Sequence, residues 1–262
     1  MNLNHKQFIR QLKRKKMLIL ILQIGLLIAM LSVWELLAKL ELIDSFITSS
    51  PSRIAKTIVE LTKNGGLWKH VWVSTYETLV GFAIGTAIGY LFAVGLWWND
   101  LIKKVVEPYL VVLNSLPKIA LGPLIILWVG TGKASIIVMT ILISVVITTI
   151  TILNGFCEVD ENKVLLLKSM QANKVQIFTK LVAPSNVPTL VATLKINVGM
   201  SWVGSIMGEY LVSKEGLGYL LIYGAQTFRL DLVMTCTIVL CGLAGIMYLG
   251  VALLEKHVES KY

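Results

Sequence analysis

At residues 134–154 the chain reads ASIIVMTILISVVITTITILN, which is 21 residues without a charged side chain. An α-helix rises about 1.5 Å per residue, so about 20 apolar residues cross the roughly 30 Å hydrocarbon core of a bilayer. Inside lipid the backbone must satisfy its own hydrogen bonds, and the alternating pattern of a membrane barrel is absent. This stretch therefore predicts a membrane-spanning helix.

Five further blocks have the same character, so we expect an all-α, polytopic membrane protein with about six transmembrane helices. The predicted spans are residues 17–38, 75–98, 105–129, 134–154, 187–207 and 232–254. Of the 262 residues, 56% are hydrophobic and 15% are charged, whereas soluble domains carry about a quarter charged residues. The mean hydropathy is +0.76.

The third predicted span is interrupted by Pro117 and Pro123, which should kink or break the helix. A short helix before Pro117 and a separate span after it would fit this pattern. The first span is too long for the core of a signal peptide and lacks a convincing cleavage site, so it is interpreted as retained. The three cysteines have no metal-type spacing and two lie in a predicted span, so we expect no disulfide framework.

Lys and Arg residues in the loops predict the orientation, because they concentrate on the cytoplasmic side. With the N-terminus inside, the cytoplasmic segments hold 14 basic residues and the outer segments hold eight. The cluster Lys13-Arg14-Lys15-Lys16 directly before the first span is the strongest signal. We therefore expect an inner-membrane protein with both termini in the cytoplasm, a basic N-terminal segment at 1–16 and one transmembrane domain at 17–262. Topology explains most of the net charge of +9, contact with anionic lipid is secondary, and nothing requires nucleic acid.

Two segments outside the predicted spans have helical patterns. In the outer segment, Ser50 and Pro51 predict the start of a short amphipathic helix. Its apolar face would hold Ile54, Ile58 and Leu61, and it is interpreted mainly as a packing element.

The inner segment 155–186 is too long to be a simple connection. It predicts two short cytoplasmic helices, the second of which ends before Pro184. The apolar side of the second helix holds Val175, Phe178, Leu181 and Val182. Exposed apolar residues here indicate either a docking surface for another protein or helices that fold back on their own bundle, and the pattern leaves both open.

Several stretches, in the same order along nearly the whole chain, follow a known pattern. They are Trp34-Glu35-Leu36-Leu37, Ser50-Pro51-Ser52, Gly81-Phe82-Ala83-Ile84-Gly85 with Gly89, Leu116-Pro117-Lys118-Ile119-Ala120-Leu121-Gly122-Pro123-Leu124, Trp128-Val129-Gly130-Thr131-Gly132, residues 164–195, Gly208-Glu209-Tyr210 and Glu215-Gly216-Leu217-Gly218. This pattern resembles the permease subunits of binding-protein-dependent ABC importers, and most closely the nitrate, sulfonate, taurine and bicarbonate group.

The resemblance implies two permease subunits, expected to be identical, together with cytoplasmic ATPase subunits and an outer solute-binding protein. Segment 155–186 would be the coupling loop that the ATPase grips. The coupling residues implied are Glu161, Leu165, Leu166, Leu167, Gln171, Ala172 and Pro184. The family usually carries Glu-Ala-Ala and a later Gly where this chain holds Leu165, Leu166, Leu167 and Gln171, so details of the partner contact differ.

The chain is not expected to be an enzyme or to bind a cofactor. Gly130-Thr131-Gly132-Lys133 lacks the spacing of a phosphate loop, and no Ser or Thr follows Lys133. ATP would be bound by the partner subunit. No cluster of His, Cys, Asp or Glu has catalytic or metal-binding spacing.

Glycines and small polar residues form regular faces in the spans. Gly81, Gly85 and Gly89 give one smooth helix face for close contact, within the subunit or, as the less favoured alternative, between subunits. Polar stripes run along spans four and five, with Ser144 and Thr148 in span four and Thr193, Asn197 and Ser201 in span five. The hypothesis is that these five line the translocation pathway; the alternative is that they hydrogen-bond packed helices.

Some ionisable residues lie in or near the spans, among them Lys195, Glu35, Glu77 and Glu209. Lys195 is about two turns inside span five, where it could snorkel to the headgroups or attract an anionic substrate. Glu35, Glu77 and Glu209 are placed near the outer ends of their spans, where water is expected to reach them, with structural or gating roles.

The transported solute follows from the resemblance alone. It implies a small organic or inorganic anion such as a sulfonate, taurine or nitrate, with a vitamin precursor as the alternative. A secondary carrier or channel without ATP, which would need inverted repeats or an ion-coupling cluster, and a purely structural anchor are the competing classes.

Overall fold

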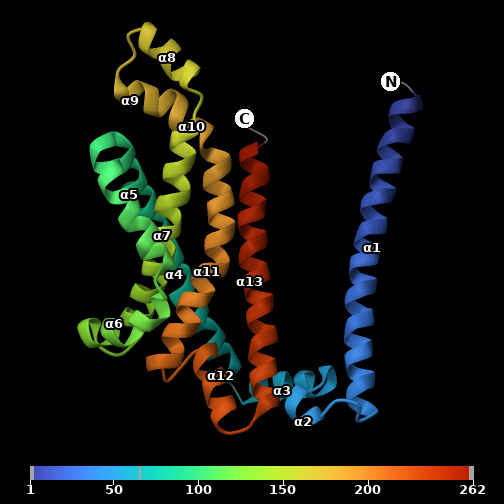
Figure 1. Cartoon of the computed structure of the whole chain (residues 1–262). Coiled ribbons are helices and arrows are strands. Elements are labelled where there is room, and N and C mark those ends of the chain that lie inside the picture. The colour runs from blue at the N-terminus through green and yellow to red at the C-terminus, as the bar shows by residue number, and fades with distance from the viewer. Residues whose placement is uncertain (1–2, 65, 260–262) are drawn as a thin grey trace.

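The computed structural model describes residues 3–64 and 66–259, and every regular element in these ranges is a helix (Figure 1). Five helices are long and apolar enough to cross a membrane, and one bent pair is a sixth candidate. The prediction of an all-α membrane protein with about six spans is therefore confirmed.

The five long helices coincide with five of the predicted blocks and extend past their ends. They are α1 (Leu3–Lys39), α4 (Leu67–Trp98), α7 (Lys133–Cys157), α11 (Val187–Val212) and α13 (Leu230–Glu259). Residues 3–16 of the basic segment belong to the same helix, α1.

α4 also begins earlier than predicted, at Leu67 rather than at residue 75. Leu67 is only 4% exposed and belongs to an apolar cluster with Leu217 and Leu232. Contacts outside the apolar block therefore hold the two additional turns, and hydropathy alone does not detect them.

The third predicted span is broken. Its parts are α5 (Asp100–Ser115), a 3₁₀ turn η1 (Lys118–Leu121) and α6 (Gly122–Val129), and the two halves are bent by 88°. The predicted break at Pro117 is confirmed. The expected full span after it is wrong, because α6 has only eight residues and ends at Gly130, whose φ is 92°.

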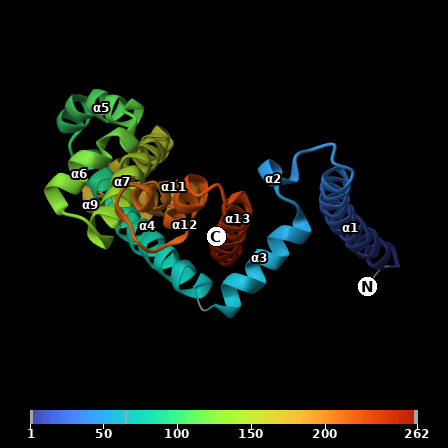
Figure 2. The ribbon, with the colours of Figure 1, turned by 90° about the horizontal axis from the view of Figure 1, so that it is seen from below.

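Three helices form the core of the bundle. α4, α7 and α11 pack against one another, and α13 packs on α11. α1 stands apart from this core in both views and contacts the short helices α2 (Ser45–Thr48) and α3 (Pro51–Lys63) (Figures 1 and 2). The apolar part of α1 is 0% buried.

Helix α3 is the amphipathic helix predicted in the outer segment. The Ser50 hydroxyl accepts a hydrogen bond from the Arg53 N–H, which caps the first turn. Ile54 is buried, and Ile58 and Leu61 pack on the cluster formed with α12 (Leu217–Gln226) and α13. The predicted start, face and packing role of this helix are confirmed.

The remaining helices form an arm, α8 (Glu161–Ser169), α9 (Lys174–Ile177), the π-helical turn η2 (Phe178–Val182) and α10 (Ala183–Ser185). The arm lies at one end of the bundle, together with the described start of α1 and the described end of α13 (Figure 1). α3, α6 and α12 lie at the opposite end.

Candidate functional site

The arm is built from local capping signals. The Asp160 side chain accepts the Asn162 N–H at 2.9 Å and starts α8, while Asn173 and Gln176 form a reciprocal capping box that starts α9. Between them Gln171 has φ +60°, a left-handed conformation that glycine adopts at the least cost. The arm is thus two short helices joined by a tight turn.

The sequence predicted that the second arm helix ends before Pro184, and this prediction is wrong. The helix continues through η2 into α10 and ends at Ser185. Pro184 lies in the first turn of α10, where a missing N–H is tolerated. The π-helical turn directly before it also relaxes the hydrogen-bond register.

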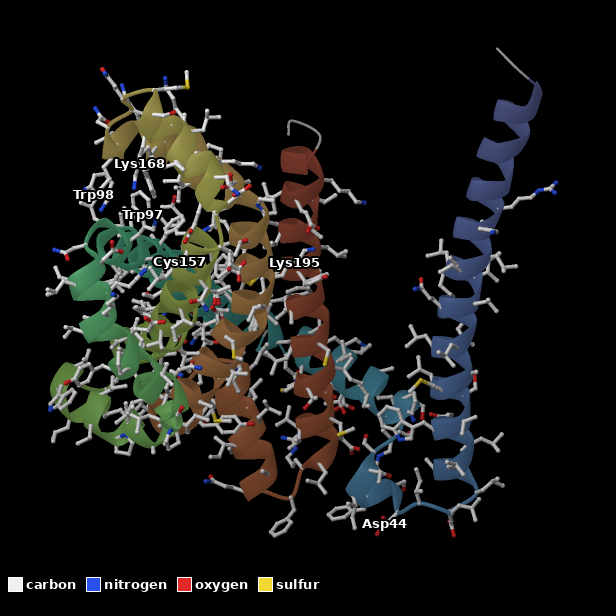
Figure 3. The ribbon with its side chains drawn as sticks, turned by 45° about the horizontal axis from the view of Figure 1, so that its top comes forward. Asp44, Trp97, Trp98, Cys157, Lys168 and Lys195 are labelled. Atoms are coloured by element: carbon white, nitrogen blue, oxygen red, sulfur yellow. The ribbon has the colours of Figure 1, made fainter. Side chains whose placement is uncertain are left out.

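Aromatic side chains fix the base of the arm to the ends of α4 and α7. The ring of Phe178 lies 5.1 Å from that of Trp97 and 5.4 Å from that of Phe156. Lys174 Nζ donates to the Trp98 carbonyl at 2.6 Å and lies 5.4 Å from the Trp97 ring. Figure 3 shows Trp97 and Trp98 beneath the arm.

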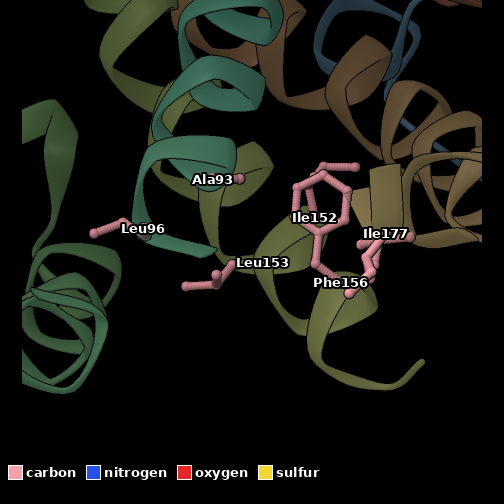
Figure 4. Packing of buried hydrophobic residues seen from close by; sticks show 7 residues of the cluster. Ala93, Leu96, Ile152, Leu153, Phe156 and Ile177 are labelled. Atoms are coloured by element: carbon pink, nitrogen blue, oxygen red, sulfur yellow. The ribbon is translucent and has the colours of Figure 1, made fainter. Parts of the chain in front are cut away.

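Apolar burial continues below these rings. Ile177 and Val182 of the arm are buried together with Ala93, Ile152 and Phe156 (Figure 4). The base of the arm is therefore part of the hydrophobic core, and a displacement of the arm must move the ends of α4 and α7.

The predicted coupling residues divide into an inner and an outer group. Leu167 and Ala172 pack against the core cluster, and Pro184 is half-buried. Leu165 and Leu166 are 65% and 61% exposed. Glu161 and Gln171 are also exposed. The sequence left open whether the apolar residues of the arm pack on the bundle or stay exposed. Both occur, on different faces of α8.

One exposed residue of the arm was missed. Met170 is 71% exposed at the end of α8, next to the turn at Gln171. Leu165, Leu166 and Met170 are named here the arm tip. The apolar character of these residues was visible in the sequence. Leu167 in the same run packs on the core instead, and only the tertiary contacts distinguish the exposed leucines from the buried one.

The three glycines of α4 face α7. A Cβ at Gly81, Gly85 or Gly89 would lie 2.5 to 2.7 Å from side-chain atoms of α7. The α7 residues contacted are Thr140, Ser144 and Thr148. The glycine face therefore lies inside the subunit.

The polar stripes meet at the same contacts. Asn197 Nδ2 donates to Thr148 Oγ1 at 2.6 Å and to Thr86 Oγ1 at 3.1 Å, and the hydroxyls of Ser144 and Ser201 are 3.1 Å apart. Thr193 donates to a carbonyl of its own helix. The five residues predicted to line the pathway are all 0% exposed, which favours the alternative that they join packed helices.

Lys195 lies between α11 and α13 (Figure 3). Its Nζ is 2.5 Å from Glu255 Oε2 of α13 and 5.9 Å from the Tyr248 ring. The positive charge is therefore compensated by a carboxylate of the neighbouring helix, and this pairing favours neither snorkelling to lipid nor capture of an anion.

The expected access of water to Glu77 and Glu209 is wrong. Both side chains are 0% exposed. Gly216 in the loop before α12 and Gly218 at the start of α12 lie against the Glu209 side chain, and Glu77 in turn lies against Glu209. Glu35 is different, since its side chain is 20% exposed and accepts the Ser52 N–H at 3.0 Å. The position of a residue near a helix end does not reveal that the following loop folds back over Glu209, or that Glu77 meets a carboxyl group of another helix.

A further cation, Lys118, lies inside the broken third span. Lys118 lies in the break between α5 and α6, and its Nζ donates to the Asn114 carbonyl at 3.1 Å. Asn114 and Ser115 beside it are exposed on the subunit surface. The signal that could have found Lys118 was its position between two prolines inside an apolar block.

Comparison with known proteins agrees with this architecture. A model of the family described as binding-protein-dependent transport system inner membrane component matches residues 85–260. The chain is 24% identical to the putative aliphatic sulfonates transport permease protein SsuC of Bacillus subtilis, over 88% of this chain and 85% of that protein. It is 28% identical to the formylaminopyrimidine transport permease protein ThiX of Halalkalibacterium halodurans, over 71% of this chain and 74% of that protein.

A solved structure has the same fold. The match is to a chain of the MetNI methionine ABC transporter in an inward-facing conformation, with a TM-score of 0.65 and 22% identity over 73% of this chain and 95% of that chain. The bundle, the arm and the family match lead to one conclusion. The chain belongs to the family of binding-protein-dependent transport system inner membrane components, and it is the permease subunit of an ABC importer.

Proposed function

We propose that this chain is one half of a homodimeric permease that imports a small anion, driven by ATPase subunits that dock on the arm tip. The observation that carries the proposal is the arm itself, whose base is fixed in the core while its tip is apolar and exposed. Partner ATPase and solute-binding subunits are a general property of the family.

Docking at the arm tip is supported by its surroundings. The arm lies beyond the ends of α4 and α7, so lipid does not account for the exposure of Leu165, Leu166 and Met170. A contiguous exposed apolar surface in water marks a contact with another protein. Glu161 and Gln171 are exposed on the same arm and would flank the contact.

A second copy is supported by the broken span. α5 has no buried residue, and Asn114, Ser115 and the irregular turn at Pro117 lie on its exposed side. Irregular backbone and polar side chains are tolerated at membrane depth only against protein or a water-filled path. A homodimer whose translocation pathway lies at this surface would give these groups both a protein neighbour and access to water.

The substrate class is supported by one charge and one relative. Lys118 lies at the break and belongs to this same surface, so two copies would present two cations to the pathway. Glu255 already pairs with Lys195, which leaves Lys118 as the better candidate for attracting an anion. The relative named for aliphatic sulfonates aligns with most of this chain.

The docking proposal is tested by co-purification. The tagged chain is extracted in mild detergent from its native membrane, and an ATPase subunit is expected to co-purify. Leu165→Glu with Leu166→Glu should lose the ATPase while keeping normal insertion, whereas Lys256→Glu, an exposed residue at the end of α13, should retain it. ATPase retention by the double variant would refute docking at the arm tip.

The substrate is tested by uptake in cells that lack the chain and are complemented with it. Labelled taurine, an alkanesulfonate and nitrate are compared with formylaminopyrimidine. Anion uptake should return with the wild-type chain and fail with Lys118→Met, whose ATPase still co-purifies. The 28% identity to ThiX makes formylaminopyrimidine the second candidate, and restoration of its uptake alone would replace the anion assignment.

A further inference from the structure

Two buried carboxyl groups meet beneath the start of α12. Glu77 of α4 and Glu209 of α11 are both 0% exposed, and their side chains lie within hydrogen-bonding reach of each other. Both oxygens of Glu77 and Oε1 of Glu209 have no donor in the described structure. Two ionised carboxylates in contact and away from water would repel each other, with no solvent to reduce the repulsion.

The two glutamates have different surroundings. Glu209 Oε2 accepts the Gly218 N–H at 2.6 Å, and Glu209 also accepts the Ser74 hydroxyl and the Tyr219 N–H. These donors and the N-terminal end of α12 stabilise a negative charge on Glu209. Glu77 accepts no such hydrogen bond. The side chain within hydrogen-bonding reach of Glu77 is that of Glu209.

We propose that Glu77 and Glu209 form a proton-binding site, in which a neutral Glu77 donates its O–H to the ionised Glu209. The shared proton joins α4 to α11, and Glu209 in turn caps α12. One proton removes the charge repulsion and satisfies Glu209 Oε1, and the pair keeps a single negative charge. The site does not depend on the identity of the transported solute.

The backbone next to the site is shaped around Glu209. Gly216 has φ +106°, and a Cβ added there would collide with the Glu209 carboxylate. The Gly216 N–H donates to His70 Nδ1 at 2.9 Å, and the Leu217 N–H donates to Ser74 Oγ at 2.7 Å. The loop before α12 is thus fixed on α4 by two further hydrogen bonds, directly over the carboxyl pair.

No ion pair joins either glutamate to a cation in the described chain. Other titratable groups surround the pair from α4, α7, α11, α13 and the loop before α12. They are His70, Lys133, Tyr210, Cys236 and Glu215. Lys69 is held by Glu215 at 2.6 Å, and Lys133 acts on Glu77 without forming an ion pair with it. A proton rather than a side-chain cation therefore removes the repulsion within the pair.

The consequence is a pH-dependent attachment of α12. When the pH rises far enough, the Glu77 O–H bond breaks, the proton leaves to water, and two carboxylates face each other. The repulsion then loosens the start of α12, whereas acidification leaves the attachment in place.

Infrared spectroscopy of the full-length protein tests the site. At neutral pH the wild-type protein should have the C=O band of a protonated carboxyl, shifted in D₂O and lost on alkaline titration. Glu77→Gln should lose this band and keep the thermal unfolding temperature, because the amide retains the shape and the donor. Glu60→Gln, an exposed glutamate on α3, should keep both.

Several results would overturn the proposal. They are absence of the band in the wild-type protein at neutral pH, its persistence in Glu77→Gln, and destabilisation of Glu77→Gln, since a neutral isostere must be tolerated. Stabilisation by sodium ions without a protonated carboxyl would assign the site to a metal cation instead.

Discussion

At the scale of single residues, glycines set how closely the helices of the core approach. A Cβ at Gly85 would lie 2.7 Å from the Ser144 Cβ and 3.2 Å from backbone atoms of Ile141. Backbone cannot rotate away as a side chain does, so an added methyl group must separate α4 from α7. Gly95 on the same helix has nothing within 4 Å of this position.

These two glycines give a matched prediction. Gly85→Ala should lower the stability of the folded subunit by about 1 to 3 kcal/mol, the usual cost of overpacking. Gly95→Ala should instead stabilise it slightly, by up to about 1 kcal/mol, because alanine is the better helix former and the position is open. Thermal unfolding in detergent measures both, and equal losses would show that α4 and α7 are not in close contact.

Gln171 gives a second prediction at this scale, because its φ of +60° suits glycine. A non-glycine residue in this conformation costs about 1 to 2 kcal/mol, of which the greater flexibility of unfolded glycine cancels about 0.5 to 1 kcal/mol. Gln171→Gly should therefore stabilise the arm slightly. Ser169→Gly, in the last turn of α8, should weaken it, and slower proteolysis of the first variant than of the second is the expected measurement.

At the scale of elements, the arm can transmit a displacement to α4 and α7 only if its base is rigidly attached to them. Phe178 contacts Trp97 and Phe156, whereas Val175 on α9 is 53% exposed. Removing the Phe178 ring should cost up to about 3 kcal/mol of local stability, the low end for a buried Phe.

Phe178→Ala should accordingly weaken the mechanical connection between the arm and the ends of α4 and α7. We expect faster proteolysis of the arm and a several-fold loss of transport, with the ATPase still bound to Leu165 and Leu166. Val175→Ala should behave as the wild type in both assays. Normal transport by Phe178→Ala would mean that the aromatic contacts do not transmit the motion of the arm.

The loop before α12 is joined to α4 by an exposed ion pair. Lys69 Nζ lies 2.6 Å from Glu215 Oε1, and this hydrogen bond lowers the pKa of Glu215 below its usual value. A lowered pKa means that the folded state favours the ionised form, so the stabilisation is present at neutral pH and lost as the pH falls through that pKa.

Glu215→Gln should remove this part of the acid sensitivity. The unfolding temperatures of the variant and the wild type should differ at neutral pH and converge below the ordinary pKa of a glutamate, about 4.3. The difference will be small because the pair is exposed. A constant difference at all pH values would exclude the ion pair as its cause.

At the scale of the whole molecule, the arm and the described ends of α1 and α13 share one side of the bundle. The distribution of basic residues predicts that this side is cytoplasmic. Single cysteines test the prediction in a background where Cys157, Cys236 and Cys241 are replaced by Ser. An impermeant maleimide should label Glu60→Cys in intact cells, and Lys256→Cys only after the cells are opened. The reverse pattern would invert the topology.

Composition, hydropathy and local signals determined a large part of this protein. The apolar blocks, the cap at Ser50 and the break at Pro117 are properties of neighbouring residues, so the five long spans, α3 and the break between α5 and α6 could be predicted. The motifs that indicated the family are also short stretches of neighbouring residues, so they could be recognised in the sequence.

Only the tertiary structure decided which polar groups meet and which face water. It placed Asn197 against Thr148, paired Lys195 with Glu255, and buried Glu77 against Glu209, which lies more than a hundred positions along the chain. Leu166 and Leu167 are adjacent and chemically identical, yet one is exposed and the other packs on the core. Burial depends on contacts between segments distant in sequence, and a pattern read along one helix does not contain its neighbours.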